Sequence, residues 1–333
     1  MKRFFAFLLL AFVFSSCDDG DLTEVSFEFD DSPAQSCNTT TNDFFIYKTQ
    51  DKRALIIQLP ESNFPNQISA DLSTQPLPLN INGTSVRLIY REYSGNVTVN
   101  TICSAVPASN PFVVKEQEAI EGKINITTTA IKTIPDANGA TKIAAYLHTL
   151  VFTDLKFDLG DGTSQINEAF SQITYETPAV TFANFAGLTS LFSCSNDNSF
   201  LFKYNPTQAL ILDLKDSDAA YLFSNEAGPK TRLINTENRL LHLFFNTTIN
   251  SLSNSYFCTN PTPETPPIID TFNAENGIEN QSGIIEVTSL ASDNGYKHTI
   301  ILKKIRLVKG SLKIQMADEF ILGEYETITP VQP

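Results

Sequence analysis

Short runs in which apolar and polar residues alternate recur along most of the chain. At the first of them, Val25, Phe27 and Phe29 alternate with a serine and a glutamate, which is the pattern of a strand with one buried face. Comparable runs, separated by turn residues, predict strands at residues 45–48, 54–59, 86–90, 97–103, 122–128, 146–158 and 163–177. No stretch has a convincing helical period, so we expect an all-β protein.

The pattern of the first half returns in the second half. The runs at residues 45–48 and 54–59 recur 155 positions later as Phe-Leu-Phe-Lys and Ala-Leu-Ile-Leu-Asp-Leu, and after Cys258 the offset becomes 150. About seven or eight short strands in about 150 residues are typical of a β-sandwich. We therefore predict two tandem, internally duplicated β-sandwich domains, immunoglobulin-like or jelly-roll-like, at residues 25–178 (the first half) and 179–333 (the second half).

The joint between the two predicted domains is very short. Only Pro178 and Ala179 separate the last strand of the first half from the first strand of the second half. A linker of this length leaves little freedom between domains. We therefore expect the two domains to be nearly fixed relative to each other.

The first residues of the chain have the organisation of an export signal. Two basic residues precede an apolar run at residues 4–14, which is too short to span a bilayer, and two serines lead into Cys17. A cysteine at the cleavage point resembles a bacterial lipoprotein signal, in the relaxed form of Bacteroidota lipoproteins, because Phe14 stands where leucine is usual. The resemblance implies that residues 1–16 are a signal peptide and that Cys17 becomes the lipidated first residue.

The residues after Cys17 extend this resemblance. Seven acidic residues and no lysine or arginine lie between positions 18 and 31. Such a stretch is similar to the signal that sends Bacteroidota lipoproteins to the outer face of the outer membrane, so residues 17–24 would be an acidic lipidated tether. The implied three acyl chains would hold the protein on the membrane essentially permanently. An ordinary signal peptide, with Cys17 as a spare thiol, is the alternative.

The remaining four cysteines divide evenly between the two halves. Each half has one cysteine before its second strand and one at the end of its fifth, so the repeat predicts the disulfides Cys37–Cys103 and Cys194–Cys258, which close loops of 66 and 64 residues. Disulfides are typical of exported proteins. Metal binding is disfavoured because no two of these cysteines form a C-x-x-C pair, and we expect no metal site.

The overall charge excludes one class of partner. The formal net charge is −14, and removing residues 1–16, which include two basic and no acidic residues, leaves 21 basic and 37 acidic side chains, or −16. Such a surface repels phosphate backbones, so nucleic acid is an unexpected partner. The chain also has no Trp, which weighs against an extended sugar-binding platform.

Few residues suggest catalysis. His148 and His298 occupy equivalent positions beside Tyr and Thr, but no acid or nucleophile accompanies them in a recognisable arrangement, so we interpret them as hydrogen-bonded packing residues. His242, whose counterpart at the same offset is Arg87, is interpreted as a surface residue of a strand. The three glutamates of residues 116–121 could be paired acids for glycoside cleavage, although their spacing equally fits a solvated face. No phosphate-loop, dinucleotide or metalloprotease motif occurs. We expect no enzyme activity and no cofactor.

One charge reversal distinguishes the two halves. Where the first half has three aspartates and one lysine at residues 154–161, the second half has five basic residues within eleven positions: Lys303, Lys304, Arg306, Lys309 and Lys313. This cluster could be a solvated sheet face. Alternatively, it could be a docking face for an acidic partner.

The sequence favours a binding protein over an enzyme. We expect a non-catalytic surface lipoprotein, anchored to the outer membrane through lipid on Cys17 and facing the cell exterior. It would act as a protein-interaction or scaffold module, an accessory subunit of a transport or assembly complex whose partner is an outer-membrane β-barrel or another surface protein. The alternative is a glycan-binding or nutrient-binding lipoprotein associated with an outer-membrane importer. Sandwich folds host many functions, so the fold alone does not decide between them.

Overall fold

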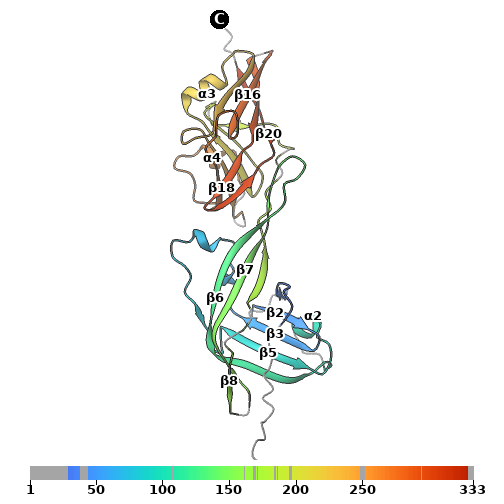
Figure 1. Ribbon diagram of the computed structural model, residues 1–333. Coiled ribbons are helices and arrows are strands. Elements are labelled where there is room, and N and C mark those ends of the chain that lie inside the picture. The colour runs from blue at the N-terminus through green and yellow to red at the C-terminus, as the bar shows by residue number, and fades with distance from the viewer. Residues whose placement is uncertain are drawn as a thin grey trace, which may run out of the picture.

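The structure is a computed structural model that describes residues 29–37, 44–104, 106, 109–160, 162–167, 170, 172–183, 185, 187–194, 197–247, 252–293 and 295–328. Cys17, with the predicted signal peptide and tether at residues 1–16 and 17–24, lies outside this range. The protein is all-β, as the alternation of apolar and polar residues predicts, and it is built from several antiparallel sheets. The two halves follow each other end to end in an elongated molecule (Figure 1).

The first half forms one continuous sheet. Its strands are β1 (Gln35–Ser36), β2 (Phe45–Gln50), β3 (Arg53–Gln58), β4 (Leu79–Asn80), β5 (Arg87–Tyr93), β6 (Val113–Lys132), β7 (Ile143–Asp158), β8 (Ser164–Asn167) and β9 (Ile173–Pro178). They pair in the order β1-β2-β3-β5-β6-β7-β8, with β4 on β6 and β9 on β7. The helical segments are the 3₁₀ turns η1 (Glu61–Asn63) and η2 (Ser69–Asp71) and the helix α2 (Val99–Cys103).

The second half contains two separate sheets. Its strands are β10 (Phe192–Ser193), β11 (Phe200–Tyr204), β12 (Gln208–Asp213), β13 (Gly228–Leu233), β14 (Arg239–Phe245), β15 (Ile268–Ala274), β16 (Ile284–Ser292), β17 (Gly295–Lys303), β18 (Arg306–Lys309), β19 (Leu312–Gln315) and β20 (Glu319–Ile328). One sheet has the order β10-β11-β12-β14-β15-β18-β19, and the other has the order β13-β16-β17-β20. The helices are α3 (Asp216–Leu222) and α4 (Asn254–Cys258).

The two halves share one strand order. In the first half, β6 and β7 each belong to two paths, β1-β2-β3-β5-β6-β7-β8 and β4-β6-β7-β9, which match the seven-stranded and four-stranded sheets of the second half strand for strand. In the second half, β15 and β16 take the place of β6, and β17 and β18 take the place of β7. This agreement supports the tandem duplication inferred from the sequence, which itself stays a prediction.

Long strands β6 and β7 pass between the two paths by bending. Gly122, in the middle of β6, has φ +144°, and a Cβ there would lie 2.7 Å from Leu155 Cδ2, so only glycine fits without displacement. Asp154 of β7 has φ +56°, and its counterpart Lys304 has φ +48° at the break between β17 and β18. The bend in one half and the break in the other therefore lie at equivalent positions.

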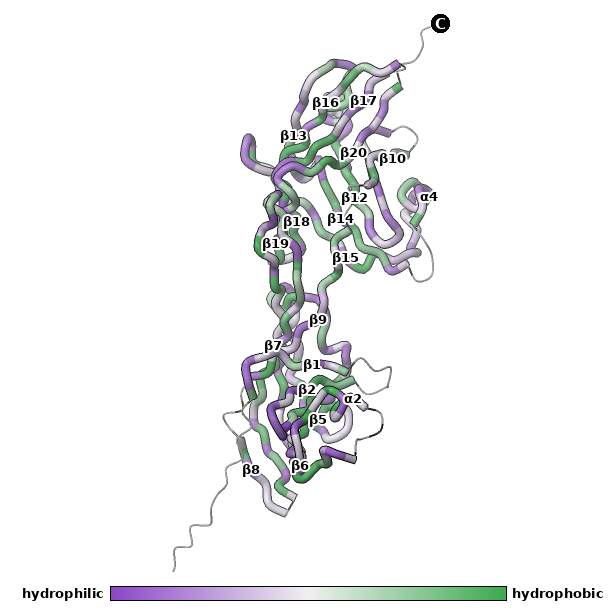
Figure 2. Tube along the Cα trace, turned by 90° about the vertical axis from the view of Figure 1, so that its right-hand side faces the viewer, coloured by the Kyte–Doolittle hydropathy of each residue, from purple (hydrophilic) through white to green (hydrophobic). Residues whose placement is uncertain are grey.

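Each half has a core between its two paths. In the first half, buried residues of β2, β3 and β5 pack against those of β6, β7 and β9, among them Leu55, Leu88 and Leu150. The second half has the same arrangement around Leu210, Leu240 and Ile300. Hydrophobic residues follow the central strands β12, β14 and β15 in Figure 2. Burial of apolar surface between the layers is the main source of stability for such a sandwich.

In each half, a short helix covers the outer face of the longer strand path, which begins with β1 in the first half and with β10 in the second. Ile102 and Cys103 of α2 pack on the buried residues Tyr47, Ile56 and Ile89. In the second half, Tyr256 and Phe257 of α4 pack on Phe202, Leu243 and Phe245. The cores therefore have a third, partial layer, which the sequence did not predict.

Two of the expected strands are wrong. Residues 97–103 form helix α2 at their end, because Thr98 and Thr101 make a reciprocal capping box that satisfies the first backbone donors. Residues 163–177 form two strands, β8 and β9, which pair with different parts of β7. In addition, the strand expected at 122–128 is the middle of the much longer β6, since the bend at Gly122 divides its apolar pattern.

The two halves touch over the tip of the β6–β7 hairpin, which reaches into the second half in Figure 1. Ile143 and Tyr146 belong to the core of the second half. At the tip, the Thr141 backbone N–H donates to the Gln315 carbonyl at 2.9 Å, and the Gln315 N–H donates to Thr141 Oγ1 at 2.8 Å. The Asp71 carboxylate also accepts from the Ser311 N–H at 2.8 Å. The predicted boundary at residues 178 and 179 is therefore crossed by a shared core.

A buried lysine holds the segment that enters each half. Lys48 Nζ donates to the Asp30 carbonyl and lies 3.5 Å from the Asp30 carboxylate. Lys203, its counterpart in β11, donates to the carbonyls of Phe185 and Leu188 at 3.5 and 3.3 Å. Burial lowers the pKa of Lys203 to about 8. Both lysines thus exchange water for backbone carbonyls of the entering segment.

Candidate interaction surface

Both predicted disulfides are present. Cys37 is bonded to Cys103 and Cys194 to Cys258, with Cα–Cα distances of 5.4 Å in each case. Each bond connects the end of a covering helix, α2 or α4, to the segment that precedes the second strand of its half. The expectation that Cys103 ends a strand is wrong, but its pairing is as predicted.

His148 and His298 are fully buried and have matching partners. In the first half, Nδ1 of His148 lies 2.8 Å from Thr128 Oγ1 and Nε2 lies 2.9 Å from Thr177 Oγ1. In the second half, Ser289 and Thr327 take these places around His298, at 2.7 and 2.8 Å.

Burial lowers the pKa of both histidines to about 4, so both rings are neutral at pH 7. All four ring nitrogens have a hydroxyl partner. The geometry therefore supports the interpretation of His148 and His298 as packing residues.

His242 is not a surface residue, contrary to the expectation. It is 3% exposed and belongs to the core side of β14. Its structural counterpart is Tyr90 and not Arg87, because His242 pairs with Leu210 in the ladder while Tyr90 pairs with the equivalent Leu55. The chain between the paired strands is three residues shorter in the second half, which shifts the offset from 155 to 152.

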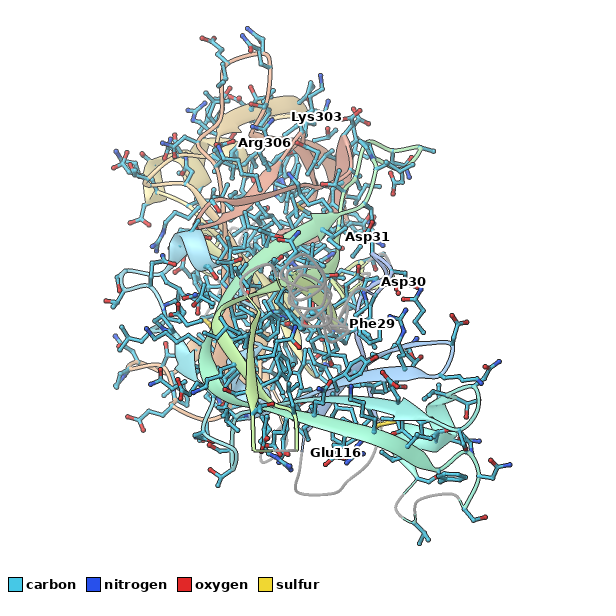
Figure 3. All side chains as sticks on the ribbon, turned by 60° about the horizontal axis from the view of Figure 1, so that its bottom comes forward. Phe29, Asp30, Asp31, Glu116, Lys303 and Arg306 are labelled. Carbon is cyan, nitrogen blue, oxygen red and sulfur yellow. A yellow bond between two sulfur atoms is a disulfide. The ribbon has the colours of Figure 1, made fainter. Side chains whose placement is uncertain are left out.

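The five basic residues of the predicted docking face lie on the second half, where Lys303 and Arg306 are labelled in Figure 3, and four of them are paired within the chain. Lys303 lies 2.9 Å from Glu286, Lys309 lies 2.9 Å from Asp270, and Arg306 and Lys313 both contact Glu275, at 3.1 and 2.6 Å. Among the described residues, Lys304 is the one of the five without an ion pair.

Neighbouring carboxylates thus neutralise most of this charge. The two basic residues at Glu275 hold its pKa below the usual value, chiefly through the Lys313 hydrogen bond. The geometry therefore favours the solvated-face interpretation over a basic docking face.

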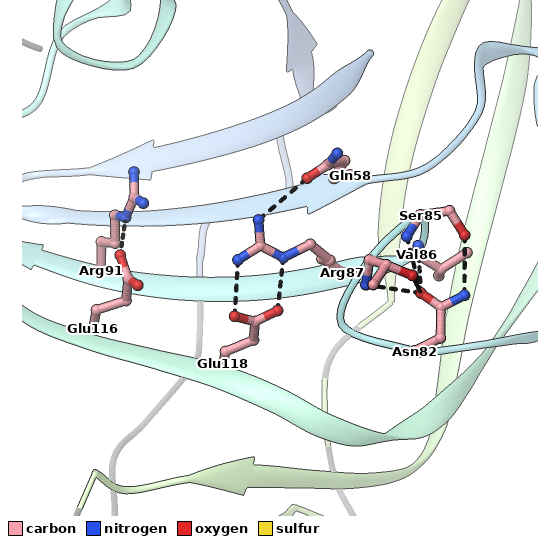
Figure 4. A network of polar contacts seen from close by, with 9 residues as sticks. Gln58, Asn82, Ser85, Val86, Arg87, Arg91, Glu116 and Glu118 are labelled. Carbon is pink, nitrogen blue, oxygen red and sulfur yellow. Dashed lines mark hydrogen bonds and ion pairs between the residues drawn. The ribbon is translucent and has the colours of Figure 1, made fainter. Parts of the chain in front are cut away.

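The acidic residues of β6 are paired as well. Glu118 receives two hydrogen bonds from Arg87, at 2.7 and 2.9 Å, and Glu116 receives one from Arg91 at 2.6 Å, as Figure 4 shows. A cleft of about 500 Å³ beside them is also lined by Asp158. Both carboxylates are engaged by arginine, which leaves no free acid pair for glycoside cleavage.

One feature that the sequence reasoning missed is a pair of exposed aliphatic residues in each half. Val113 and Val114 begin β6 and are 41% and 62% exposed, while Ile268 and Ile269 begin β15 and are 45% and 58% exposed. They are equivalent, because the bulged ladders place Val113 and Ile268 at the same position, so the offset of 155 continues past Cys258 and changes to 150 only further along the chain. We call these pairs the first and second aliphatic edges. The signal in the sequence was two β-branched residues after a proline-containing loop at the same place in both halves.

The two aliphatic edges have the same backbone geometry. In the first half, Glu92 pairs with Lys115 and Tyr93 with Val113, so the ladder skips Val114. In the second half, Phe244 pairs with Asp270 and Phe245 with Ile268, so the ladder skips Ile269. Each edge is therefore a β-bulge, a feature that redirects side chains next to binding sites.

The outer side of both edges lacks a ladder partner. Among the described residues, those at 113–118 pair only with β5 and those at 268–272 pair only with β14. Backbone groups without a ladder partner therefore accompany the exposed aliphatic side chains, although the Thr271 N–H donates to Asp270 Oδ1 at 2.8 Å. This combination can accept an added strand or an apolar protein surface.

Comparisons with protein-family models, curated proteins and solved structures found no match. No helix in the described part of the chain is long and apolar enough to cross a membrane. The same residues contain no group of three or more His, Cys, Asp or Glu side chains placed to hold a metal ion. The interpretation of function therefore depends on the surfaces of the molecule itself.

Proposed function

We propose that this chain is a non-catalytic protein-interaction module, a lipid-anchored subunit at the outer-membrane surface that binds its partner through the two aliphatic edges. The observation that carries this proposal is their recurrence. Val113–Val114 and Ile268–Ile269 stay aliphatic, exposed and bulged in both halves. Packing does not require an apolar side chain at a position that is half exposed.

Other exposed apolar residues do not recur in this way. At the same offset of 155, Val99 is replaced by Asn254 and Ile120 by Glu275. These two solvent-facing positions have therefore diverged toward polar residues. The retention of aliphatic residues at both edges indicates a contact, since an apolar patch is otherwise a liability for solubility.

The rigid junction adds to the proposal. Because the hairpin tip and the shared core hold the two halves together, the two edges keep a constant separation. A partner that contacts both edges gains an effective-concentration advantage over one that contacts a single edge. A stable scaffold of this kind suits an accessory subunit of a larger complex.

The proposed lipid on Cys17 would place the first half near the membrane. Eleven residues separate Cys17 from Phe29, and at about 3.5 Å per residue the segment reaches at most about 40 Å. The segment that follows is held by Lys48 and the disulfide at Cys37. The first half would therefore be the membrane-proximal one, and the second half would extend away from it.

The test is purification of the tagged, full-length protein from its own membrane in mild detergent. Wild type should bring along a β-barrel or another surface protein, Val114→Asp and Ile269→Asp should each reduce its recovery, and the double variant should abolish it. Val99→Asp, at an exposed apolar position that does not recur, is the matched control and should retain the partner.

Two outcomes would contradict the proposal. Equal recovery from wild type and the double variant would remove the edges from the interface. Recovery of the wild-type protein alone would favour independent capture of a glycan or nutrient. In the same preparation, Cys17→Ser should move the protein from the membrane to the soluble fraction, which tests the anchor separately.

A further inference from the structure

A second candidate binding site lies at the junction of the two halves. It is a cleft of about 300 Å³ between the tip of the β6–β7 hairpin, the residues Phe182, Ala183 and Phe185, and strands of the second half. Its volume is at the lower end of the range for small-molecule pockets. The cleft therefore suits a single ring system better than a long chain.

The inner walls of the cleft are aromatic and aliphatic. They include Phe182, Phe185, Phe320, Leu307, Ile314 and Met316. Aromatic rings contact other rings favourably in edge-to-face or offset arrangements, and the flexible thioether of methionine adapts to different shapes. These walls favour an apolar, planar group.

One buried polar side chain lies among these apolar inner walls. His242 lines the cleft, and its Nε2 lies 2.8 Å from Gln208 Oε1. Gln208 Oε1 also accepts from the Ala183 N–H, while Gln208 Nε2 donates to the Thr181 carbonyl. The amide orientation is therefore determined, and His242 Nε2 must carry the proton that it donates.

The other ring nitrogen of His242 is consequently an acceptor. Burial lowers the pKa of His242 to about 4, so the neutral ring keeps a lone pair on Nδ1 at pH 7. No described residue donates a hydrogen bond to this nitrogen, unlike Nδ1 of His148 and His298, which have hydroxyl partners. Among the apolar inner walls, His242 therefore offers one acceptor, which matches a ligand with one donor.

We propose that this cleft binds one aromatic group that carries a single hydrogen-bond donor, a phenol or an indole, with the donor directed at His242 Nδ1. The group can come from a tyrosine or tryptophan side chain of a protein or from a free aromatic molecule. The site needs both halves, because the first half supplies the hairpin wall that Thr141 and Gln315 hold in place. This inference does not depend on the aliphatic edges.

The experiment uses ¹⁹F NMR of 4-fluorophenol and fluorobenzene with the full chain, since the two probes differ only in the hydroxyl group. Both should bind, and 4-fluorophenol should bind about five times more tightly, which is the effect of one hydrogen bond. His242→Phe should remove this preference while keeping the binding of fluorobenzene, which also shows that the variant is folded.

A second pair of variants tests the cleft without changing His242. Ala317 lines the cleft, so Ala317→Phe should displace both probes. Ala137 lies on the same hairpin tip, is exposed and does not line the cleft. The control Ala137→Phe should therefore leave both affinities unchanged.

Peptides distinguish the two sources of the aromatic group. If the ligand is a side chain, acetyl-Ala-Tyr-Ala-amide should compete with 4-fluorophenol and acetyl-Ala-Phe-Ala-amide should compete less well. If the ligand is a free molecule, neither peptide should compete while 4-fluorophenol still binds. The proposal would be overturned if neither fluorinated probe binds. It would also be overturned if wild type binds both probes equally well, or if His242→Phe keeps the preference for 4-fluorophenol.

Discussion

The two halves build the same strand order in different ways. In the first half, β6 and β7 run unbroken from the longer strand path into the shorter one and bend at Gly122 and Asp154. In the second half, both strands are interrupted, and the loop at residues 275–283 and the turn at Lys304 replace the bends. The order in which the strands pair is therefore the property that both halves share. Strand continuity is the property that varies, since the second half is interrupted although Gly277 stands at the offset of 155 from Gly122.

The interiors of the halves differ at one equivalent pair. Gln117 pairs with Tyr90 in the first half, where Phe272 pairs with His242 in the second. Gln117 is 1% exposed, and neither polar atom of its side chain has a partner among the described residues. Phe272 instead packs edge-to-face on Phe182, 5.1 Å between ring centres. The core of the first half thus has the polar side chain of Gln117 at the position where the core of the second half has packed aromatic rings.

The largest effect is expected from the disulfides. Replacing Cys103 or Cys258 by serine opens loops of 66 and 64 residues, and the chain-entropy model gives a loss of about 4 kcal/mol for either loop. Denaturant unfolding of Cys103→Ser and Cys258→Ser under oxidising conditions measures both. If the two losses of unfolding free energy differ by more than about 1.5 kcal/mol, the two disulfides do not stabilise their halves equally.

Acid should destabilise both halves through their buried histidines. The folded pKa values of His148 and His298 are about 4, below the unfolded value of about 6.5. The unfolded chain therefore binds more protons between these values, and stability is lost as the pH falls through that window. Each histidine should contribute up to about 3 kcal/mol across it.

His148→Gln and His298→Gln test this contribution. Each variant should show a shallower fall of unfolding free energy between pH 6.5 and 4, measured by denaturant titration at several pH values. The two changes should be alike, because the hydroxyl partners of the rings are alike. A wild-type slope in either variant would show that the ring titrates in the folded state as it does in water.

The bend in β6 predicts a smaller, local effect. Gly122→Ala should cost about 2 kcal/mol, since the new Cβ meets Leu155 and the backbone is held at φ +144°. Gly160→Ala is the matched control. Its φ is also positive, but a Cβ there has no neighbour within 4 Å, so only the backbone strain remains. Thermal unfolding that is the same for both variants would remove steric contact as the reason for glycine at the bend.

The smallest expected change is a gain. Gln117→Met conserves volume and removes a buried polar group without a partner, so it should stabilise the chain by about 1 kcal/mol. The reciprocal variant Phe272→Gln should be destabilising, because it imports the unpartnered group into the second core. A loss of stability in Gln117→Met, measured by denaturant unfolding, would indicate that the amide of Gln117 has a partner in solution.

Much of the fold could be predicted because the repeat supplied a second copy of each signal. The strands at Phe45 and Ala54 and both disulfides follow from it. Helix α2 could not be predicted, since its five residues are specified by the Thr98–Thr101 capping box and not by a periodic pattern. The burial of His242 was missed because the offset changes from 155 to 152 between β12 and β14, which moved its apparent counterpart to Arg87.

The candidate site was harder to predict than the fold. The basic cluster on β17–β19 was conspicuous in the sequence, yet its partners Glu275 and Asp270 are about thirty to forty residues away in the chain. Pairing over such distances is invisible in a local pattern. Conversely, Val114 lies between two of the predicted strands, and only the register of the ladder reveals the bulge that exposes it and Ile269.

The way in which the chain enters the first half determines how it can resist force. Three contacts follow one another along the entering segment. Lys48 donates a hydrogen bond to the Asp30 carbonyl, the Ala34 N–H donates to the Thr174 carbonyl of β9, and Cys37 is bonded to Cys103. Tension that arrives from the amino-terminal side is therefore passed to the last strand and to a covalent link before it reaches β2. Pulling there loads β9 and the disulfide together before β2 can be separated from the sheet.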